Sequence, residues 1–333
     1  MLNISHKSYG KTDVGLVREK NEDNLFLDKE NGVYVVCDGM GGHSAGEIAS
    51  QTAVNLFKTV FVNYQEELLK ENNLLPITET LPPKGNLLLK IIRLANRSIY
   101  RQAMDNSSQS GMGTTVVAIA LENDFISVAH VGDSRVYLLN ETELKPLTED
   151  HSFIVEAQKT SDMTEEELSK IYGKNVITRA LGVKGTVQID YSLHKLNKSD
   201  RIILCSDGLC GFASDKEIFE TASENNENLE NIVDSLIKLA IDKGGKDNVT
   251  VVGVEITDLL KTVQEPIAPF TIKDESPETL SQSDYWLQMF MTKPDSNQND
   301  SNKNSGPNKF LLFSIFAAFI IIAATIIYIS GNN

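Results

Sequence analysis

Cysteine, tryptophan and positive charge are all scarce in this sequence of 333 residues. The three cysteines form no CxxC pair and no Cys/His cluster with zinc-ligand spacing, which excludes a disulfide scaffold and a structural zinc site and is typical of a reducing compartment. The formal net charge of −15 opposes binding to phosphate backbones, so we expect no nucleic-acid partner. The N-terminus lacks an apolar run of signal-peptide length, so we expect no cleaved secretion signal.

One uncharged stretch stands apart near the C-terminus: residues 310–329 read FLLFSIFAAFIIIAATIIYI. As a helix it would span about 30 Å, the thickness of one hydrocarbon core. A buried core helix is the alternative, but such a helix usually carries a polar stripe. We therefore predict a single transmembrane helix over 310–329, in contact with membrane lipid and followed by a short tail, 330–333. Because Lys303 and Lys309 precede it and no basic residue follows, we expect the large N-terminal part in the cytoplasm.

The rest of the chain divides into a globular domain and a linker. Apolar patterning predicts a folded domain over 1–257. Residues 258–309 are predicted to be a partly disordered linker, because 296–309 is rich in Asn and Ser and has no apolar periodicity. Within this linker, the sequence YWLQMF at 285–290 is apolar enough to dock on another surface or to touch the bilayer, and both alternatives stay open.

Short apolar runs alternate with helical patterns in the globular domain. The runs at 33–37 and 201–205 are typical of strands buried on both faces. Turns of only one to three residues separate three further runs, so we expect antiparallel neighbours at 114–121, 125–131 and 135–140. A last strand is expected at 249–256, and helices are expected after the capping boxes Ser44–Glu47, Thr164–Glu167 and Ser214–Glu217 and over 86–105 and 228–243. This order predicts a layered α+β domain with an antiparallel core.

Aspartates follow or precede four of these strands. Asp38 comes directly after an apolar run, Asp133 follows the glycine after a run, and Asp207 follows the serine after a run. Asp247 precedes the last strand. A single Asp-Gly pair is best interpreted as a turn, but its repetition favours convergence at one rim. Converging carboxylates need protons or cations, and all-oxygen ligands favour Mg²⁺ or Mn²⁺. Two such ions would generate a hydroxide nucleophile near neutral pH.

An arginine in the segment DVGLVREKNED adds a cation beside acids. By itself, Arg18 is best interpreted as a surface or ion-pair residue. Beside a dimetal site, its guanidinium could hold phosphate oxygens in a bidentate fork, which makes a phosphate ester the natural substrate.

With these features together, the chain closely resembles the metal-dependent Ser/Thr protein phosphatases of the protein phosphatase 2C type, in their bacterial branch. The match covers nearly all of 8–256. The matching segments are DVGLVREKNED (13–23), VVCDGMGGHSAGEIAS (35–50), GMGTT (111–115), AHVGDSRVY (129–137), LTEDHS (147–152) with KNVITRALG (174–182), and CSDGL (205–209) with GGKDNVTVV (244–252).

The resemblance implies a fold and a set of residue roles. The fold is a four-layer αββα sandwich, in which helix pairs flank two antiparallel sheets. Residues 148–185 would form a mobile flap beside the active site. Two Mg²⁺ or Mn²⁺ ions would be held directly by Asp38, the Gly39 carbonyl, Asp207 and Asp247, and through water by Glu22 and Asp23. A third, weaker ion would be held by Asp133 with Asp207. Arg18 would bind the phosphate.

The general acid is where the sequence departs from eukaryotic relatives, which have a histidine directly after the Asp-Gly pair. Met40 occupies that position here, and His43 lies three residues on. Two interpretations of His43 stay open: an acid that protonates the leaving alkoxide, or a hydrogen-bonding residue at a helix start, with a metal-bound water as the acid instead. The proline-containing segment 72–86 is predicted to be an inserted surface loop.

The predicted function is dephosphorylation of phosphoserine and phosphothreonine on proteins by direct attack of a dimetal-bound hydroxide. With the transmembrane helix, this predicts an enzyme that opposes Ser/Thr kinase signalling at the membrane, with a membrane Ser/Thr kinase and its substrates as partners. Two alternatives remain: a phosphatase of small metabolites, and a non-catalytic scaffold that binds phosphorylated groups.

Overall fold

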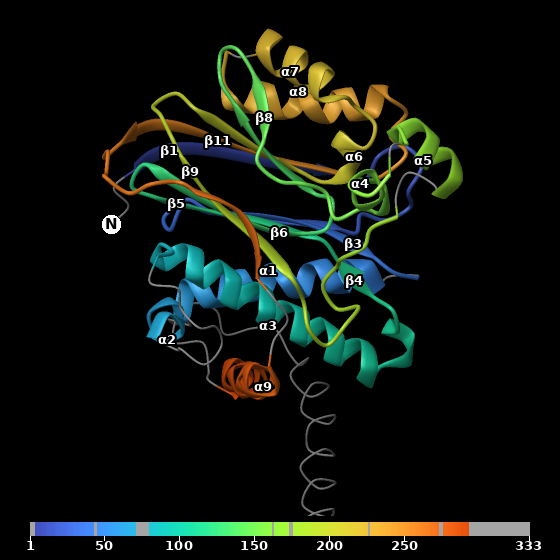
Figure 1. Ribbon diagram of the computed structural model, residues 1–333, viewed down its shortest axis with the longest axis vertical. Coiled ribbons are helices and arrows are strands. Elements are labelled where there is room, and N and C mark those ends of the chain that lie inside the picture. The colour runs from blue at the N-terminus through green and yellow to red at the C-terminus, as the bar shows by residue number, and fades with distance from the viewer. Residues whose placement is uncertain are drawn as a thin grey trace, which may run out of the picture. The chain divides into compact units, whose positions relative to one another are not determined.

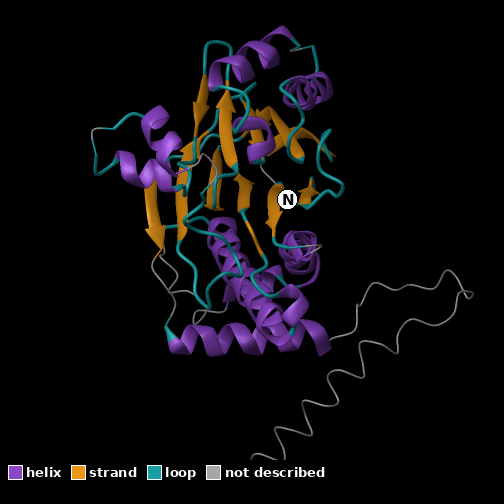
Figure 2. Ribbon diagram, turned by 90° about the vertical axis from the view of Figure 1, so that its right-hand side faces the viewer, coloured by secondary structure: helices purple, strands orange, loops and turns teal. Residues whose placement is uncertain are grey.

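The computed structural model describes residues 4–42, 45–70, 80–161, 163–172, 176–225, 227–272 and 276–292. Up to Thr292 the chain forms one compact unit. Two antiparallel sheets lie face to face in this unit, and helices cover both outer faces (Figure 1, and turned by 90° in Figure 2). The predicted α+β sandwich with two antiparallel sheets and flanking helices is confirmed.

The smaller sheet has five strands, and its neighbouring strands are all antiparallel. Their order is β1 (Ile4–Asp13), β11 (Val249–Leu259), β10 (Arg201–Cys205), β7 (Arg135–Leu139) and β8 (Leu144–Pro146).

The larger sheet has seven strands and is also antiparallel. Along its main path the order is β12 (Ile267–Ile272), β9 (Ile189–Lys195), β6 (Phe125–Val131), β5 (Val116–Glu122), β3 (Val33–Met40) and β2 (Asp23–Asp28), and the short β4 (Gly113–Thr114) pairs with the end of β3.

Two helix layers enclose the sheets (Figure 1). Helices α1 (Ala45–Asn63) and α3 (Pro83–Asp105) cover the larger sheet, and α7 (Asp215–Glu224) and α8 (Leu229–Asp242) cover the smaller one. The predicted capping box of α7 is present, with Ser214 and Glu217 bonding each other's backbone N–H. The other helices in the described part of the chain are α2 (Gln65–Lys70), η1 (Ser107–Gln109), α4 (Phe153–Gln158), α5 (Glu165–Tyr172), α6 (Asp207–Cys210) and α9 (Pro277–Thr292).

The expected loop over 72–86 is shorter than predicted at its C-terminal end. Helix α3 begins at Pro83, where the fixed φ of proline suits the first turn of a helix. Residues 71–79 lie outside the described part of the chain.

Strand β3 is buried on both faces, as its sequence predicted. Val33, Val35 and Cys37 contact the core beneath α1 and α3, whereas Tyr34 and Val36 contact the opposite sheet. Strand β10 alternates in the same way between the inter-sheet core and the core beneath α7 and α8. Because each buried apolar side chain contributes about 1.5–3 kcal/mol, these two strands are held firmly, and so are the acids at their ends.

The prediction that β6 and β7 are antiparallel neighbours is wrong. Strand β6 pairs with β5 and β9 in the larger sheet, while β7 pairs with β10 and β8 in the smaller one. The three residues Gly132–Ser134 carry the chain from one sheet to the other. A short connection therefore marks a change of sheet here and not a hairpin, and it places Asp133 between the two sheets.

The prediction of a domain that ends at residue 257 is also wrong. Strand β12 pairs with β9, and α9 belongs to the same compact unit, which ends at Thr292. Trp286 and Leu287 of the apolar YWLQMF segment are buried against the core of the larger sheet, so this segment docks on its own domain. Residues 293–309 of the predicted linker and the tail 330–333 lie outside the described residues.

The predicted transmembrane helix, 310–329, also lies outside the part of the chain that the structure describes. Among the helices that are described, none combines the length and the hydropathy that crossing a bilayer requires.

Candidate active site

The aspartates predicted to converge do meet at one rim of the sandwich. Asp38 ends the buried part of β3, and Asp23 opens β2 directly opposite it in the antiparallel register. Asp207 begins α6 one residue after the end of β10, Asp133 lies at the crossing between the sheets, and Asp247 precedes β11. We call these five residues the rim cluster.

Glycine allows the backbones to approach each other closely at both Asp-Gly pairs. A Cβ atom on Gly39 would overlap the carbonyl of Gly46, and one on Gly208 would overlap the carbonyl of Asn248. The glycine after Asp38 therefore brings the start of α1 to the site. The glycine after Asp207 brings in the segment that carries Asp247. Both pairs have a packing role beyond that of a turn.

The carboxyl groups of Asp38 and Asp207 lie close enough to interact directly. Burial raises the pKa of Asp38 well above its usual range, and the charges of Asp23 and Asp207 raise it further. Burial also raises the pKa of Asp133 to about 7, with a further contribution from the charge of Asp207. When ionised, these carboxylates repel one another.

Only one of the two carboxylate oxygens of Asp23 accepts hydrogen bonds from the described residues. One carboxylate oxygen accepts hydrogen bonds from Thr250 Oγ1 at 2.7 Å and Ser206 Oγ at 2.8 Å. The other oxygen, like Oδ1 of Asp207, is buried with no hydrogen-bond partner among the described residues. Burial raises the pKa of Asp23 to about 7, and the charges of Asp207 and Asp247 add to the shift. Buried, unpaired carboxylate oxygens fit hard divalent cations such as Mg²⁺ and Mn²⁺, so the donor set suits the predicted ions.

Arg18 lies at the opening of the rim cluster. Its Nη2 donates to Asp247 Oδ2 at 2.8 Å, and its side chain is 55% exposed against 20% for Asp247. The hydrogen bond to Asp247 raises the pKa of Arg18, and the charges of Asp38 and Asp207 act in the same direction. A half-exposed guanidinium beside buried acids can reach an oxyanion that enters from solvent.

Glu22 and Gly39 are joined through the backbone, because Gly39 N–H donates to the Glu22 carbonyl at 3.1 Å. Burial raises the pKa of the Glu22 side chain, which lies next to Gly46 at the start of α1. The structure thus brings Glu22 and Gly39 together at the rim. His43 lies outside the described residues, so its predicted role stays a prediction.

Four polar residues that sequence reasoning passed over hold the rim in place. Asn248 donates to the Val14 and Lys20 carbonyls at 3.0 and 2.9 Å and accepts from Glu22 N–H at 2.8 Å, which fixes the loop that carries Arg18. Thr115 Oγ1 accepts from Asp38 N–H at 3.0 Å. Together with Ser206 and Thr250, these residues lie within or next to the quoted motifs, and their closeness to the acids was the available signal.

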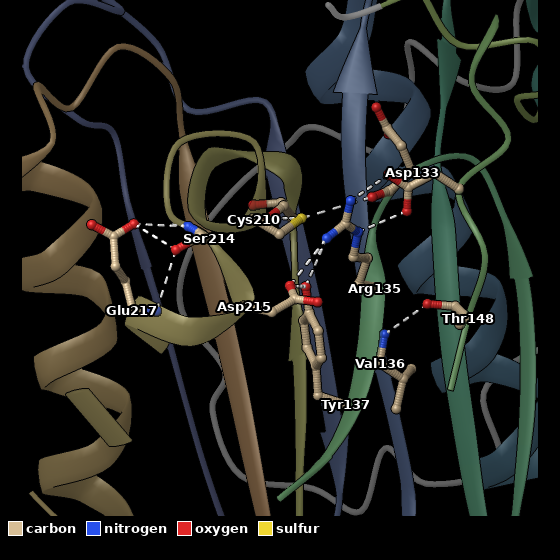
Figure 3. A network of polar contacts seen from close by, with 11 residues as sticks. Asp133, Arg135, Val136, Tyr137, Thr148, Cys210, Ser214, Asp215 and Glu217 are labelled. Atoms are coloured by element: carbon tan, nitrogen blue, oxygen red, sulfur yellow. Dashed lines mark hydrogen bonds and ion pairs between the residues drawn. The ribbon is translucent and has the colours of Figure 1, made fainter. Parts of the chain in front are cut away.

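Arg135, two residues beyond Asp133, ties the rim to the smaller sheet and to the predicted flap (Figure 3). Its Nε and Nη2 donate to the two oxygens of Asp150, both at 2.8 Å. Its Nη1 donates to Tyr137 Oη at 2.9 Å, and Tyr137 donates to Asp215 at 2.9 Å. Burial alone would lower the pKa of Arg135, but the bonds to Asp150 raise it overall, so this guanidinium stays charged.

A second polar group, His130, His151, Arg179 and Asp190, was not predicted, and we call it the flap-base cluster. Its two histidines and aspartate are spaced closely enough to hold a metal ion. However, Arg179 Nη1 already donates to Asp190 Oδ1 at 2.9 Å. His151 Nδ1 accepts from the Gly132 N–H, which leaves Nε2 to donate to Asp190 Oδ2 at 3.2 Å. The guanidinium thus supplies the positive charge that a metal would bring.

Residues 148–185, the predicted flap, contain α4 and α5 and return along 176–181 to the rim. Leu181 and Thr114 exchange two backbone hydrogen bonds, at 2.9 and 3.1 Å. A hollow of about 280 Å³ beside this segment is lined by Thr178, Arg179 and Val183, among others, and contains none of the rim acids. The acids and Arg18, and not this hollow, carry the groups suited to phosphate chemistry.

Comparisons with known proteins agree with this arrangement. Residues 17–246 match the model of the protein phosphatase 2C family. The serine/threonine phosphatase stp of Listeria monocytogenes is 38% identical over 248 residues, which cover 74% of this chain and 94% of that protein.

Two solved structures are also similar. One is the catalytic domain of the serine/threonine protein phosphatase PstP in complex with two manganese ions, with a TM-score of 0.63 and 31% identity over 76% of this chain and 99% of that one. The other is the serine/threonine phosphatase Stp1 from Staphylococcus aureus, with a TM-score of 0.66 and 33% identity over 77% of this chain and 97% of that one.

Proposed function

The chain belongs to the protein phosphatase 2C family, and we propose that it removes phosphate from phosphoserine and phosphothreonine side chains of proteins, with two Mg²⁺ or Mn²⁺ ions as cofactors. Support comes above all from the rim cluster, in which buried carboxylates raise one another's pKa and retain unpaired oxygens. The names of the relatives and the manganese-bound PstP structure support the same activity.

Each rim residue has a role in this proposal. Asp38, the Gly39 carbonyl, Asp207 and Asp247 would hold the two ions directly. Glu22 and Asp23 would hold water ligands, and Asp133 with Asp207 would hold a third, weaker ion. When bound, such ions acidify water into a hydrolytic nucleophile and withdraw charge from the phosphoryl oxygens.

The protein's own side chains supply the rest of the chemistry. Arg18 would leave Asp247 and donate its fork to two phosphoryl oxygens, which orients the ester and stabilises charge during in-line displacement. Ser206 and Thr250 fix Asp23 by hydrogen bonds, so the carboxylate cannot turn away from the site. His43 is our candidate for the proton donor to the leaving alkoxide, with water as the alternative.

A membrane location is a further part of the proposal. The uncharged run 310–329 supports anchoring by one helix, with the catalytic unit on the cytoplasmic side and a membrane Ser/Thr kinase and its substrates as partners. If so, the full chain should sediment with membranes and a chain without residues 293–333 should not. Equal sedimentation of both would contradict the anchor.

The test of the activity is phosphate release from a phosphothreonine peptide by the full chain. We expect release with Mn²⁺, loss with EDTA, recovery when Mn²⁺ is restored, and loss in Asp38→Asn. Release from p-nitrophenyl phosphate but from no phosphopeptide would favour the small-metabolite alternative. A folded protein that binds Mn²⁺ and phosphopeptide yet releases no phosphate would establish the scaffold alternative.

A further inference from the structure

Strand β12 adds an edge to the larger sheet from beyond residues 17–246, the part that matches the family model. Thr271 lies directly opposite Asp190 of β9 in the antiparallel register. The following helix, α9, is fixed to α3 by Asp284, which accepts from Arg97 Nε and Nη2 at 2.8 and 2.9 Å. The C-terminal part of the compact unit is thus anchored at both of its elements.

Asp190 connects this added strand to the predicted flap. One of its oxygens accepts from Thr271 Oγ1 at 2.6 Å and from Arg179 Nη1 at 2.9 Å. The other lies 3.2 Å from His151 Nε2. Arg179 and His151 stand on the two segments of the flap that meet at its base, where Thr178 N–H donates to the His151 carbonyl at 2.7 Å.

The connection continues from the flap to the rim cluster. Two residues beyond Arg179, Leu181 exchanges its backbone hydrogen bonds with Thr114. The Thr114 hydroxyl then donates to the Asp38 carbonyl at 2.8 Å. An unbroken series of hydrogen bonds and short backbone steps therefore leads from Thr271 to Asp38.

We propose that Thr271 and Asp190 are positioning residues, by which the C-terminal strand β12 holds the flap segment 176–181 against Thr114 and so steadies the loop that carries Asp38. The consequence for cation binding rests on the proposed function, whereas the consequence for the flap does not. Packed and hydrogen-bonded elements carry coupling of this kind over several contacts, and each step weakens it.

The chain offers a matched control within the same C-terminal segment. Thr262 Oγ1 donates to Asp124 Oδ1 at 2.6 Å, the same distance as the bond from Thr271 to Asp190. Asp124 lies in the turn between β5 and β6, and its partners Thr262 and Lys195 are not part of the flap. Thr262→Val and Thr271→Val therefore remove equivalent hydroxyls, only one of which leads to the flap.

The first measurement is amide hydrogen exchange of the metal-free full chain, read on a peptide that covers 176–181. We expect Thr271→Val to speed exchange there about threefold and Asp190→Asn about tenfold, because each loses hydrogen bonds that hold the base. Thr271→Ser, which keeps the hydroxyl, should restore the wild-type rate. Thr262→Val should leave this peptide unchanged.

The second measurement is Mn²⁺ binding by calorimetry, which needs no activity. Asp190→Asn should weaken Mn²⁺ binding about threefold, and Thr271→Val should weaken it by a smaller factor. Thermal unfolding of both variants should show that they are folded. Wild-type exchange at 176–181 in both variants would overturn the proposal, as would an equal change in Thr262→Val. Faster flap exchange with unchanged Mn²⁺ binding would overturn the link to Asp38. Absence of phosphatase activity would contradict the proposed function alone.

Discussion

The rim cluster and the flap-base cluster are both groups of buried and partly buried titratable side chains, yet their charges are balanced in opposite ways. At the rim, carboxylates lie beside carboxylates, and the pKa values of Asp23 and Asp133 rise to about 7. At the flap base, burial alone would raise the pKa of Asp190, but hydrogen bonds from His151 and Thr271 lower it well below its usual value. At the flap base, a histidine and a guanidinium bond the single acid, which makes this cluster a structural contact. At the rim, several acids repel one another, which suits them to holding cations.

The largest expected effect is on the rate of phosphate release, when an aspartate of each cluster is replaced by asparagine. Asp38→Asn should lower phosphate release from a phosphothreonine peptide by about 10³-fold or more, because it removes a proposed metal ligand. Asp190→Asn, measured at saturating Mn²⁺, should stay within about threefold of wild type, because its charge acts only on positioning. Initial rates across an Mn²⁺ titration distinguish these results. A comparable loss in both variants at saturating Mn²⁺ would abolish the distinction.

The next effect concerns the histidines of the two regions. If His43 protonates the leaving alkoxide, His43→Ala should slow phosphothreonine hydrolysis by about 10²-fold and spare p-nitrophenyl phosphate, whose leaving group needs no proton. Burial lowers the pKa of His130 to about 4, so this histidine is neutral near pH 7. His130→Asn should therefore change the hydrolysis rates of the two substrates by the same factor. The ratio of the two substrate rates is the readout. An unchanged ratio in His43→Ala would assign the proton to water.

A third comparison uses the two arginines. Arg18 is 55% exposed at the opening of the rim, so Arg18→Ala should raise KM for the phosphopeptide about tenfold with little effect on the melting temperature. Among the described residues, Arg179 donates to Asp190 within the flap base, so Arg179→Ala should lower the melting temperature by several degrees and change KM far less. Steady-state kinetics and thermal melts of both variants measure these two effects. A larger rise in KM for Arg179→Ala than for Arg18→Ala would contradict the assignment of phosphate binding to Arg18.

The smallest expected effect is the pH dependence of the metal-free protein. Asp133 has a pKa of about 7 when folded and 3.8 as the reference value. The contribution of protonated Asp133 to the free energy of unfolding is therefore complete below about pH 4, and it is lost as the pH rises toward 7. Asp133→Asn should melt at a higher temperature than wild type at pH 8, by a few degrees, with a smaller gap at pH 5. Saturating Mn²⁺ should narrow the gap at pH 8, and a gap independent of pH would contradict the burial of this acid.

Local sequence signals succeeded where neighbouring residues decide the outcome. The apolar runs that became β3 and β10, the capping box of α7 and the acids at the strand ends were all readable, because each depends on periodicity or on groups a few residues apart. The convergence of the acids was predictable because rigid strands of one sandwich end at a common rim.

Long-range pairing was not readable in the same way. The residues of the Gly132–Ser134 turn carry no local signal for a change of sheet. The change occurs because β7 pairs with β10, which comes much later in the chain. Strand β12 and helix α9 looked like linker, because the strand pairing of β12 and the packing of α9 depend on β9 and α3, more than 70 residues earlier in the chain.

The sequence by itself determined which residues are acidic, which strands are apolar on both faces, and therefore that several carboxylates would be attached to immobile strands. Only the tertiary structure decided which charges balance which. Arg179 reaches Asp190, whereas Asp38 faces Asp23 and Asp207, and no pattern along the chain distinguishes these outcomes. The reason is physical: a pKa depends on burial and on charges within a few ångströms, and both are set by segments that meet only after folding.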